Sequence, residues 1–442
     1  MSFIHPFSEE ATSSELDVFA IPTTNTAVDS ERFTAYKPVA SLASSDWIEF
    51  IVPGTNEFID PATIYIELDV EIVKSDGTAL PNAAAPAAAQ GQAAHEANLF
   101  EKIIPCNNFM SSLFQQLDVR LNNTLVTSST NMYAYRAYLD CLFYQSKHAK
   151  QTYMYTHMWE PDKSKRKERI KRCYSGKRLR LCGPLHFDLG QQERLILNQI
   201  DMAFRLNLSD SSFCLVVEDG TAHRPRVKIV DATLHVEHKK LFADCEAGIM
   251  VALANDTAKY FFTHTQMRRY VIDRNSSSYF FDNIFPSILP RRFVIGLISS
   301  KCFDGDWNTD PFEFKHHDLS EIRISRDGVQ VPSPAILQDV EDDDYARSFF
   351  CLYQNFGALH PNTQLSITAD DFKTNCALYC WNLATQKTLD NGDTVALQER
   401  GHIRAEFRFK KPTQDTLIAI VYANFGQSME ISADRTVHMS EI

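Results

Sequence analysis

The chain has 442 residues, of which 44 % are hydrophobic and 23 % are charged, and its formal net charge at pH 7 is −12. This length allows two or three domains with full cores, and the composition is ordinary for a soluble globular protein. The negative charge excludes binding of nucleic acid through the bulk electrostatics of the whole chain, and the 30 Phe and 16 Tyr favour sheet over helix.

The chain begins with a segment that predicts an arm and continues with strand patterns. Residues 1–30 are polar and punctuated by proline, so we expect an extended N-terminal arm without a secretory signal. The stretch WIEFIVPG (Trp47–Gly54) is typical of a strand that ends at a Pro-Gly turn. In IYIELDVEI (Ile64–Ile72) apolar and polar residues alternate, which indicates a strand with one dry and one wet face. The predicted core residues of this strand are Ile66, Leu68 and Val70.

An alanine-rich stretch follows, ALPNAAAPAAAQGQAAHEAN (Ala79–Asn98). Its low complexity and few large apolar residues leave too little surface to bury a core of its own. We predict a surface loop, and a protruding decoration of the molecule's exterior remains the alternative.

Later segments add hairpins, strands and a few helices. VRLNNTLV and IRISRDGVQV carry Asn-Asn or Asp-Gly between alternating runs, which predicts two-residue hairpins. Further strands are predicted at Val227–Val236 and Arg292–Ile298, and helices at Asn131–Gln145 and Leu241–Asn255. Phe407 and Ile420 are predicted core residues of the C-terminal half.

The two halves of the chain share a weak internal repeat. IDMAFRLNL resembles IRAEFRFKK, which places Phe204 and Phe407 203 positions apart (407 − 204), and Arg120 and Arg323 have the same offset. A third pair of strands, beginning at Pro61 and Pro290, is offset by 229 positions (290 − 61). The alanine-rich stretch can hold the 26 residues by which these offsets differ (229 − 203), so we predict a duplicated domain with an insertion in the first copy.

The strand count and the repeat together predict an all-β fold. We expect two tandem eight-stranded jelly-roll domains, which are Greek-key β-sandwiches, with a few short helices in loops. The expected division is an arm at 1–30, a first jelly roll at 31–238 that contains the insert 79–98, and a second jelly roll at 239–442.

One segment is strongly basic. KSKRKERIKRCYSGKRLR (Lys163–Arg180) holds ten basic residues in eighteen, a pattern that can neutralise phosphates or act as a nuclear-import signal. A solvated loop, or a contact to the acidic EDDD (Glu341–Asp344), is the alternative. The candidate nucleic-acid or import contacts are Lys165, Arg166, Lys167, Arg169, Lys171 and Arg172.

Motifs for catalysis or metal binding are not evident. The pairs His235/His238 and His316/His317 lack the two-His, Glu and distant-His spacing of a metal-binding cupin, and Glu341–Asp344 lacks the calcium-loop pattern. Glu67, Asp69 and Glu71 share a strand face, as the acids of a glycosidase do, but a solvated face explains them equally. The ten cysteines are scattered without C-x-x-C, which favours reduced thiols inside a cell. No stretch approaches the ~18 apolar residues of a membrane span. We therefore predict no catalytic site, cofactor or metal.

Several segments resemble one protein family. They are DVFAIPTTNTAV, IEFIVPGTNEFIDPATIYIELDV, LFQQLDVRLNNTLVTSSTNMYAYRAYL, HFDLGQQERLILNQIDMAFRL, LPRRFVIGLI and IVYANFGQSMEI. They are similar to double jelly-roll major capsid proteins of eukaryotic double-stranded DNA viruses and their Polinton-like relatives. The likeness spreads from about Asp17 to about Ile431, and its motifs are structural.

This resemblance implies a structural role in a virion. Three copies would form a capsomer with six similar domains, which tiles a hexagonal facet. The implied partners are the chain itself, a penton protein and, without sequence specificity, packaged DNA; assembly would occur in the nucleus or cytoplasm of the host cell. Two alternatives stay open: an enzyme with two jelly-roll domains, such as a glycan amidase or bicupin, and a host binding protein derived from a captured viral gene.

Overall fold

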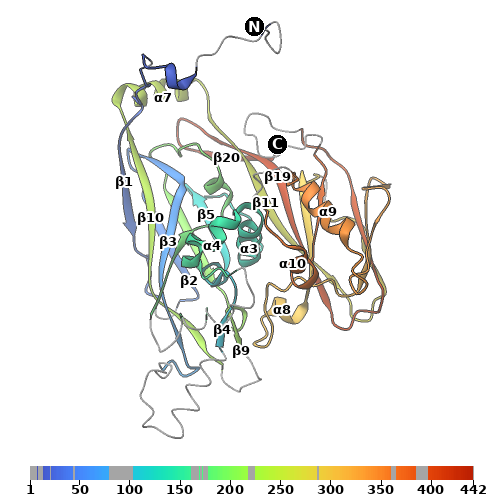
Figure 1. Cartoon of the computed structure of the whole chain (residues 1–442). Coiled ribbons are helices and arrows are strands. Elements are labelled where there is room, and N and C mark those ends of the chain that lie inside the picture. Colours follow the sequence, from blue (N-terminus) through green and yellow to red (C-terminus); the bar gives the residue numbers. More distant parts are fainter. Residues whose placement is uncertain are drawn as a thin grey trace.

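The chain folds into two β-sandwiches that lie side by side (Figure 1). A computed structural model describes residues 7, 13–19, 21–42, 45–78, 103–160, 169, 172, 178–217, 224–285, 288–359, 365–384 and 397–441. The alanine-rich insert 79–98 lies outside these described residues. None of the helices in the described ranges is long and apolar enough to span a membrane.

The first sandwich consists of two antiparallel four-stranded sheets, which we call sheet A and sheet B. In spatial order, sheet A contains β1 (Val28–Tyr36), β10 (Arg226–Leu241), β3 (Phe58–Val73) and β7 (Leu179–Pro184). Sheet B contains β2 (Trp47–Val52), β8 (Met202–Leu208), β5 (Phe114–Leu121) and β6 (Thr124–Leu125). Two short strands pair separately at one end, namely β4 (Ile103–Pro105) and β9 (Leu215–Val217).

The second sandwich repeats this arrangement in sheets that we call A′ and B′. Sheet A′ contains β11 (Ala258–Ile272), β19 (Leu417–Ile431), β13 (Arg292–Ser299) and β17 (Leu378–Asn382), and β20 (Val437–Glu441) also pairs with β19. Sheet B′ contains β12 (Ser278–Phe281), β18 (Ile403–Phe409), β14 (Leu319–Arg326) and β15 (Val329–Gln330), and β16 (Ile336–Leu337) also pairs with β14.

Both sandwiches have the same topology. If β4, β9, β16 and β20 are left out and the remaining strands of each sandwich are numbered along the chain, sheets A and A′ have the order 1-8-3-6. Sheets B and B′ have the order 2-7-4-5. This is the strand order of a jelly roll, so the predicted fold class is confirmed.

The internal repeat of the sequence coincides with equivalent strands. Phe204 and Phe407 lie on β8 and β18, the seventh strands, and Arg120 and Arg323 lie on β5 and β14, the fourth strands. The predicted two-residue hairpins also form. Asn122 and Asn123 in one turn, and Asp327 and Gly328 in the other, all have the positive φ angles that such turns require.

The core residues predicted from alternation are buried. Ile66, Leu68 and Val70 on β3 are fully enclosed, and so are Phe407 and Ile420 in the second sandwich. Burial of these faces removes apolar surface from water and is the main source of stability in such sheets.

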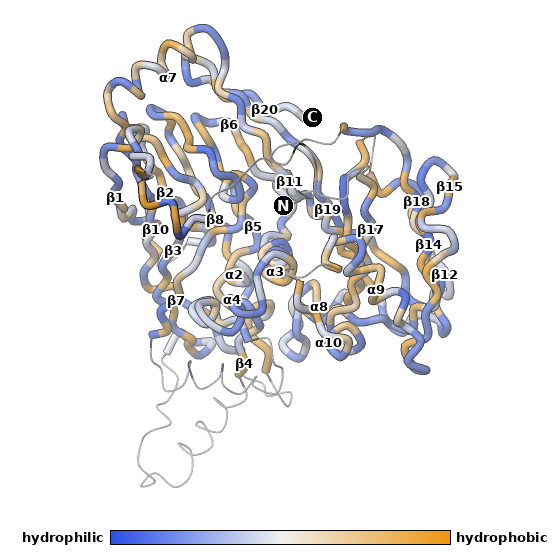
Figure 2. The backbone as a smooth tube through the Cα atoms, turned by 45° about the horizontal axis from the view of Figure 1, so that its top comes forward, coloured by the Kyte–Doolittle hydropathy of each residue, from blue (hydrophilic) through white to orange (hydrophobic). Residues whose placement is uncertain are grey.

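Helices occupy the connections. The two predicted from sequence are confirmed as α3 (Tyr133–Tyr144) and α7 (Ala243–Asn255). Figures 1 and 2 both show α3 between the two sandwiches and α7 at one end of the molecule, where it links β10 to β11. The shorter helices are η1 (Ser14–Leu16), α2 (Phe109–Ser112), α4 (Lys147–Gln151), η2 (Tyr153–His157), η5 (Asp188–Gln191), α6 (Ser211–Cys214), α8 (Ser300–Asp304), α9 (Ala346–Asn355) and α10 (Ala369–Thr374).

The division between the domains can be placed on these elements. Residue 238, where the sequence suggested the boundary, lies within β10, which continues to Leu241 in sheet A. We therefore propose that α7 is the linker between the two jelly rolls. At the other end of the first domain, β1 begins at Val28, and the described residues 13–19 and 21–27 before it are exposed.

Candidate functional site: chemical candidates and the interface between the jelly rolls

Glu67, Asp69 and Glu71 on one face of β3 each pair with an arginine. Arg180 Nε on β7 lies 2.9 Å from Asp69 Oδ1 and 3.3 Å from Glu67 Oε1. Arg178 Nε, just before β7, lies 2.9 Å from Glu71 Oε1. The acids of a glycosidase must face an open substrate site, whereas these carboxylates are held by arginine side chains from the neighbouring strand. The outer face of sheet A is therefore a ladder of ion pairs rather than a glycosidase site.

The two histidines of β10 do not converge on a ligand. His235 lies on the outer face of sheet A, where its ring stacks on Tyr65 with the centroids 4.6 Å apart. His238 is buried, and its Nε2 lies 2.9 Å from the hydroxyl of Tyr36. Within the described ranges, no three His, Cys, Asp or Glu residues are grouped so that they could hold a metal ion.

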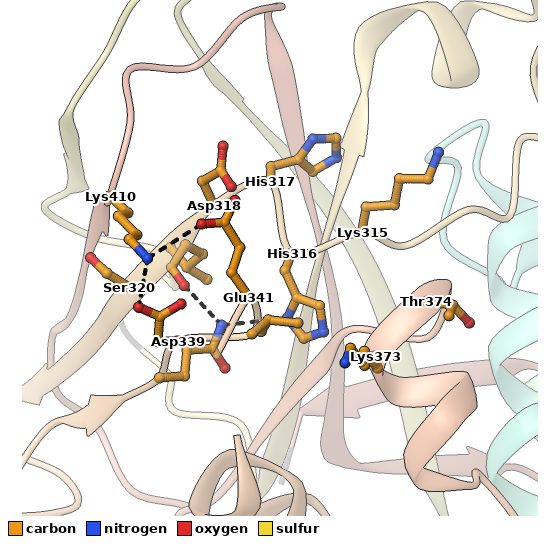
Figure 3. Close-up of a pocket in the computed structure, with 13 residues that line it drawn as sticks. Lys315, His316, His317, Asp318, Ser320, Asp339, Glu341, Lys373, Thr374 and Lys410 are labelled. Atoms are coloured by element: carbon orange, nitrogen blue, oxygen red, sulfur yellow. Dashed lines mark hydrogen bonds and ion pairs between the residues drawn. The ribbon is translucent and has the colours of Figure 1, made fainter. Parts of the chain in front are cut away.

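The second histidine pair borders a pocket of about 500 Å³ in the second jelly roll (Figure 3). His316 Nε2 lies 2.8 Å from the carbonyl oxygen of Phe372 and must donate to it, so Nδ1 accepts from the Tyr379 hydroxyl at 2.7 Å. That hydroxyl in turn accepts from Gln338 Nε2 at 2.6 Å. Burial lowers the pKa of His316 to about 4. His316 is thus a neutral side chain with both nitrogens engaged, and it joins α10 to β17 instead of serving as a general base.

The acidic loop beside this pocket is neutralised by lysines. Glu341 pairs with Lys411 at 2.8 Å and with Lys410 at 3.3 Å, and Asp343 pairs with Lys373. The loop is therefore held by local cations, and no contact to the basic run is needed to explain it.

The basic run is described at two of its six candidate positions. Arg169 is buried. The guanidinium carbon of Arg172 lies 3.8 Å from the centre of the Tyr155 ring, and its Nη1 donates to the Tyr155 carbonyl oxygen. Both described arginines are thus packed against the protein. The other four, Lys165, Arg166, Lys167 and Lys171, lie outside the described residues.

The helix α3 of the first jelly roll lies at the interface with the second. All of its twelve residues except Tyr144 are buried, including the charged Arg136 and Asp140. Its aromatic rings pack on the second jelly roll: Tyr138 stacks on Phe312 with centroids 4.3 Å apart, and Phe143 meets Tyr422 edge-on at 5.5 Å. Aromatic pairs of this kind stabilise beyond the area that they bury.

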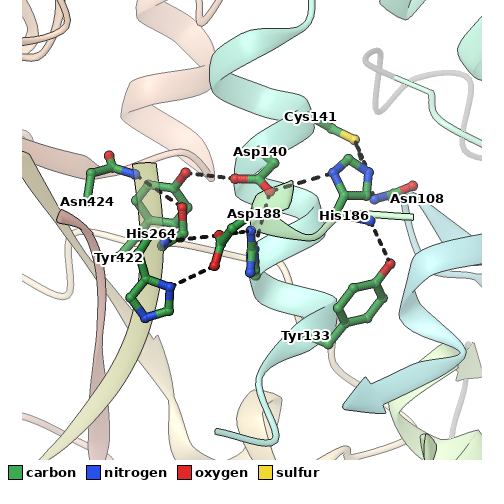
Figure 4. Close-up of polar contacts among 11 residues, drawn as sticks. Asn108, Tyr133, Asp140, Cys141, His186, Asp188, His264, Tyr422 and Asn424 are labelled. Carbon is green, nitrogen blue, oxygen red and sulfur yellow. Dashed lines mark hydrogen bonds and ion pairs between the residues drawn. The ribbon is translucent and has the colours of Figure 1, made fainter. Parts of the chain in front are cut away.

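A buried polar network accompanies these rings (Figure 4). Arg136 of α3 places its Nη2 2.5 Å from Asp188 Oδ1 of η5 and its Nε 3.6 Å from Asp140 Oδ2. The hydroxyl of Tyr422 on β19 donates to Asp140 Oδ1 at 2.7 Å. Burial alone would raise the pKa of Asp188, but Arg136 and His264 hold it below its usual value. The charged pairs thus lie within the first jelly roll, and the Tyr422 hydroxyl joins them to the second.

His186 also belongs to this network. His186 Nδ1 lies 3.6 Å from Asp140 Oδ2. Burial would lower the pKa of His186, but Cys141 and Asp140 raise it to about 10. Arg136 and His186 thus lie beside Asp140 and Asp188, and this pairing of opposite charges offsets part of the cost of desolvation.

Part of the network has the connectivity of a catalytic triad. His264 of β11 places Nδ1 2.7 Å from Asp188 Oδ2 and Nε2 3.0 Å from Ser128 Oγ. The adjoining cavity, which Ser128 lines, has a volume of about 20 Å³, enough for one water molecule. The three residues thus form a hydrogen-bonded link between the domains. Sequence reasoning missed this link because its members lie far apart in the chain and on separate elements.

Comparisons with known proteins support the fold. No protein-family model matches the chain. An uncharacterized protein of Caenorhabditis elegans is 22 % identical over 330 residues, which cover 73 % of this chain and 78 % of that protein.

Three solved viral structures match nearly the whole chain. The structure of the Sputnik virophage has a TM-score of 0.63 at 12 % identity and covers 100 % of this chain and 94 % of its own. The PBCV-1 virus capsid gives 0.59 at 10 % identity over 96 % and 99 %. The mavirus major capsid protein gives 0.53 at 9 % identity over 100 % and 95 %. The chain therefore has the double jelly-roll fold of these viral capsid proteins.

Proposed function

We propose that the chain is a major capsid protein, three copies of which form a pseudo-hexagonal capsomer of an icosahedral DNA virus shell. The observation that carries the proposal is the pair of jelly rolls with identical strand order, fixed to each other by the buried helix α3. Three such pairs around a threefold axis present six similar domains, and a six-sided block can tile a flat facet. The role is structural rather than catalytic.

The oligomeric state of the purified chain tests this proposal. We expect sedimentation velocity to show trimers, and electron microscopy to show six-sided particles, hexagonal arrays or closed shells. A species that stays monomeric from micromolar to millimolar concentration would contradict it.

The Caenorhabditis elegans relative supports a second candidate, a host protein derived from a captured viral gene. Such a protein would keep the fold and bind a host partner without forming a lattice. Trimers that never associate further, even under crowding that drives capsid assembly, would favour this candidate over the virion component.

We propose further that the basic run contacts packaged DNA through its phosphates. Arg169 and Arg172 have packing roles, so the informative variant replaces Lys165, Arg166, Lys167 and Lys171 by serine and keeps the two arginines. We expect less DNA per particle and a weaker salt dependence of DNA binding. Unchanged packaging would leave the run as an import signal or a subunit contact. The penton partner, and assembly in the nucleus or the cytoplasm, belong to this proposal as well.

A further inference from the structure

Sheets A and A′ are equivalent in topology but differ in what covers them. The outer face of A′ lies against the first jelly roll, where Tyr422 of β19 bonds to α3 and Arg292 of β13 donates to the Tyr144 hydroxyl at 2.7 Å. The outer face of sheet A carries the ion-pair ladder and ends in an aromatic group, of which Phe33 is 56 % exposed. Within the described part of the chain, no helix covers sheet A in the way that α3 covers sheet A′.

The helix α9 is the counterpart of α3 in chain order, although α3 packs on the fourth strand of its own domain and α9 on the sixth. Each follows the fifth strand of its domain and precedes the sixth. Cys141-Leu142 of α3 recurs as Cys351-Leu352 of α9, 210 positions later (351 − 141), and Tyr135 recurs as Tyr345.

The two helices also differ in what covers them: α3 is covered, as sheet A′ is, whereas α9 is largely uncovered, as sheet A is. All but one residue of α3 are buried, whereas α9 buries only Ser348 and Leu352 of its ten. Phe350 of α9 is 52 % exposed, and Leu337 on the neighbouring β16 is 60 % exposed. The second jelly roll thus has an uncovered apolar flank where the first has a buried one.

The shared Cys-Leu pair also aligns the two helices residue by residue. On α9, Phe350 occupies the place of Asp140 on α3, since both precede the shared Cys-Leu pair by one residue. Asp140 is the residue that meets Tyr422 of sheet A′. A contact of the same geometry on sheet A would therefore place Phe350 on the equivalent of Tyr422.

That equivalent is His235. Tyr422 pairs with Val294 of β13, and the 229-residue offset relates Val294 to Tyr65 of β3 (294 − 65). Tyr65 pairs with His235 of β10. His235 and Tyr65 stack on each other, and the Phe33 ring lies 6.1 Å from Tyr65, so this spot is an aromatic patch.

We infer that α9 of one copy packs on the outer face of sheet A of a second copy, with Phe350 against the patch of Phe33, Tyr65 and His235. Sheet A belongs to the first jelly roll and α9 to the second, so the two surfaces are different parts of the chain (Figure 1). The contact is therefore heterologous, and three copies close it into a ring. Each domain then meets its neighbour in the same way, within the chain through α3 and between chains through α9. This inference rests on the proposed capsomer and identifies its subunit interface.

The first test disrupts the contact with one charge. We expect Phe350→Asp to convert trimers into monomers that remain folded by circular dichroism, because the side chain is half-exposed in the single chain. The matched control is Val251→Asp on α7, where the side chain is 66 % exposed and is not part of the proposed contact, so this variant should remain trimeric. If the unaltered chain forms trimers and Phe350→Asp forms them equally well, the interface is wrong while the capsid proposal stands. If the unaltered chain never forms trimers, both fall.

The second test identifies the contact directly. We replace Phe350 by the photo-crosslinking analogue p-benzoylphenylalanine, irradiate the trimer and map the product by mass spectrometry. The expected product joins position 350 to the segments that contain Tyr65 or His235 of another copy. A crosslink to any segment outside β1, β3 and β10 would overturn the inference, even if the trimer itself is intact.

Discussion

Strands β3 and β13 are the third strands of their jelly rolls, yet they have different sequence patterns. From Ile64 to Ile72, β3 alternates buried apolar with half-exposed polar residues, whereas β13 buries every residue from Arg292 to Ile298. The difference follows from the outer face, which is covered by the first domain on A′ and by side-chain ion pairs and solvent on A. A strand of an antiparallel sheet needs continuous hydrophobicity only where both of its faces are dry. The comparison therefore shows that the cover of the outer face within the chain, rather than topology, determines the pattern.

The largest effect should come from a charge on the dry face of β3. We expect Leu68→Asp to cost on the order of 5 kcal/mol or to prevent folding, because a buried carboxylate without a partner is expensive. Chemical denaturation of the purified variant measures this loss. The adjacent Asp69→Ala on the wet face is the control, and an equal loss in both would show that our assignment of the faces is wrong.

A somewhat smaller effect is expected at the buried network on A′. Asp188→Ala should cost about 3–5 kcal/mol, because it leaves Arg136 buried without one of its carboxylates. The matched control is Asp231→Ala on sheet A, where an exposed ion pair with Lys37 is removed at a cost of about 0–1 kcal/mol. Equal denaturation midpoints for the two variants would show that the buried ion pair at A′ and the exposed ion pair on A do not differ in strength.

The pH dependence of the domain interface should be measurable at Lys150. Its Nζ donates to the carbonyl of Leu142 on α3 and to Ser366 Oγ of the second jelly roll, and burial lowers its pKa to about 8. Because the folded pKa lies below the value of 10.5 in the unfolded chain, the folded state loses its proton first. Between about pH 8 and pH 10.5 the unaltered chain should therefore gain stability relative to Lys150→Met, by up to about 3 kcal/mol. A constant difference in unfolding free energy across this range would refute the assignment.

The smallest effect should appear on the wet face of sheet A. Arg180→Ala removes two ion pairs, but the arginine is largely exposed, so we expect a small loss of stability at low salt and a smaller one at high salt. Thermal melts at two salt concentrations measure it. A loss as large as that of Asp188→Ala would show that the ladder is not solvated.

Much of the fold could be predicted from the sequence, because strands and hairpins have local patterns. The alternation around Leu68 indicated a strand, and Asn122-Asn123 indicated a turn, without any knowledge of distant partners. The interface could not be predicted in this way. Asp188, His264 and Ser128 meet only after both domains have folded, and no local pattern connects them. A signal for the interface was nevertheless present in α3, where Arg136 and Asp140 are the only charged residues and large apolar and aromatic residues occupy the other sides.

The most direct test of the account is a cryo-electron microscopy map of the purified, assembled chain. The account predicts a threefold particle with six similar jelly rolls, in which α9 of each copy covers sheet A of the next and Phe350 reaches Tyr65 and His235. A map of a monomer, or of a trimer whose sheet A faces solvent, would contradict it.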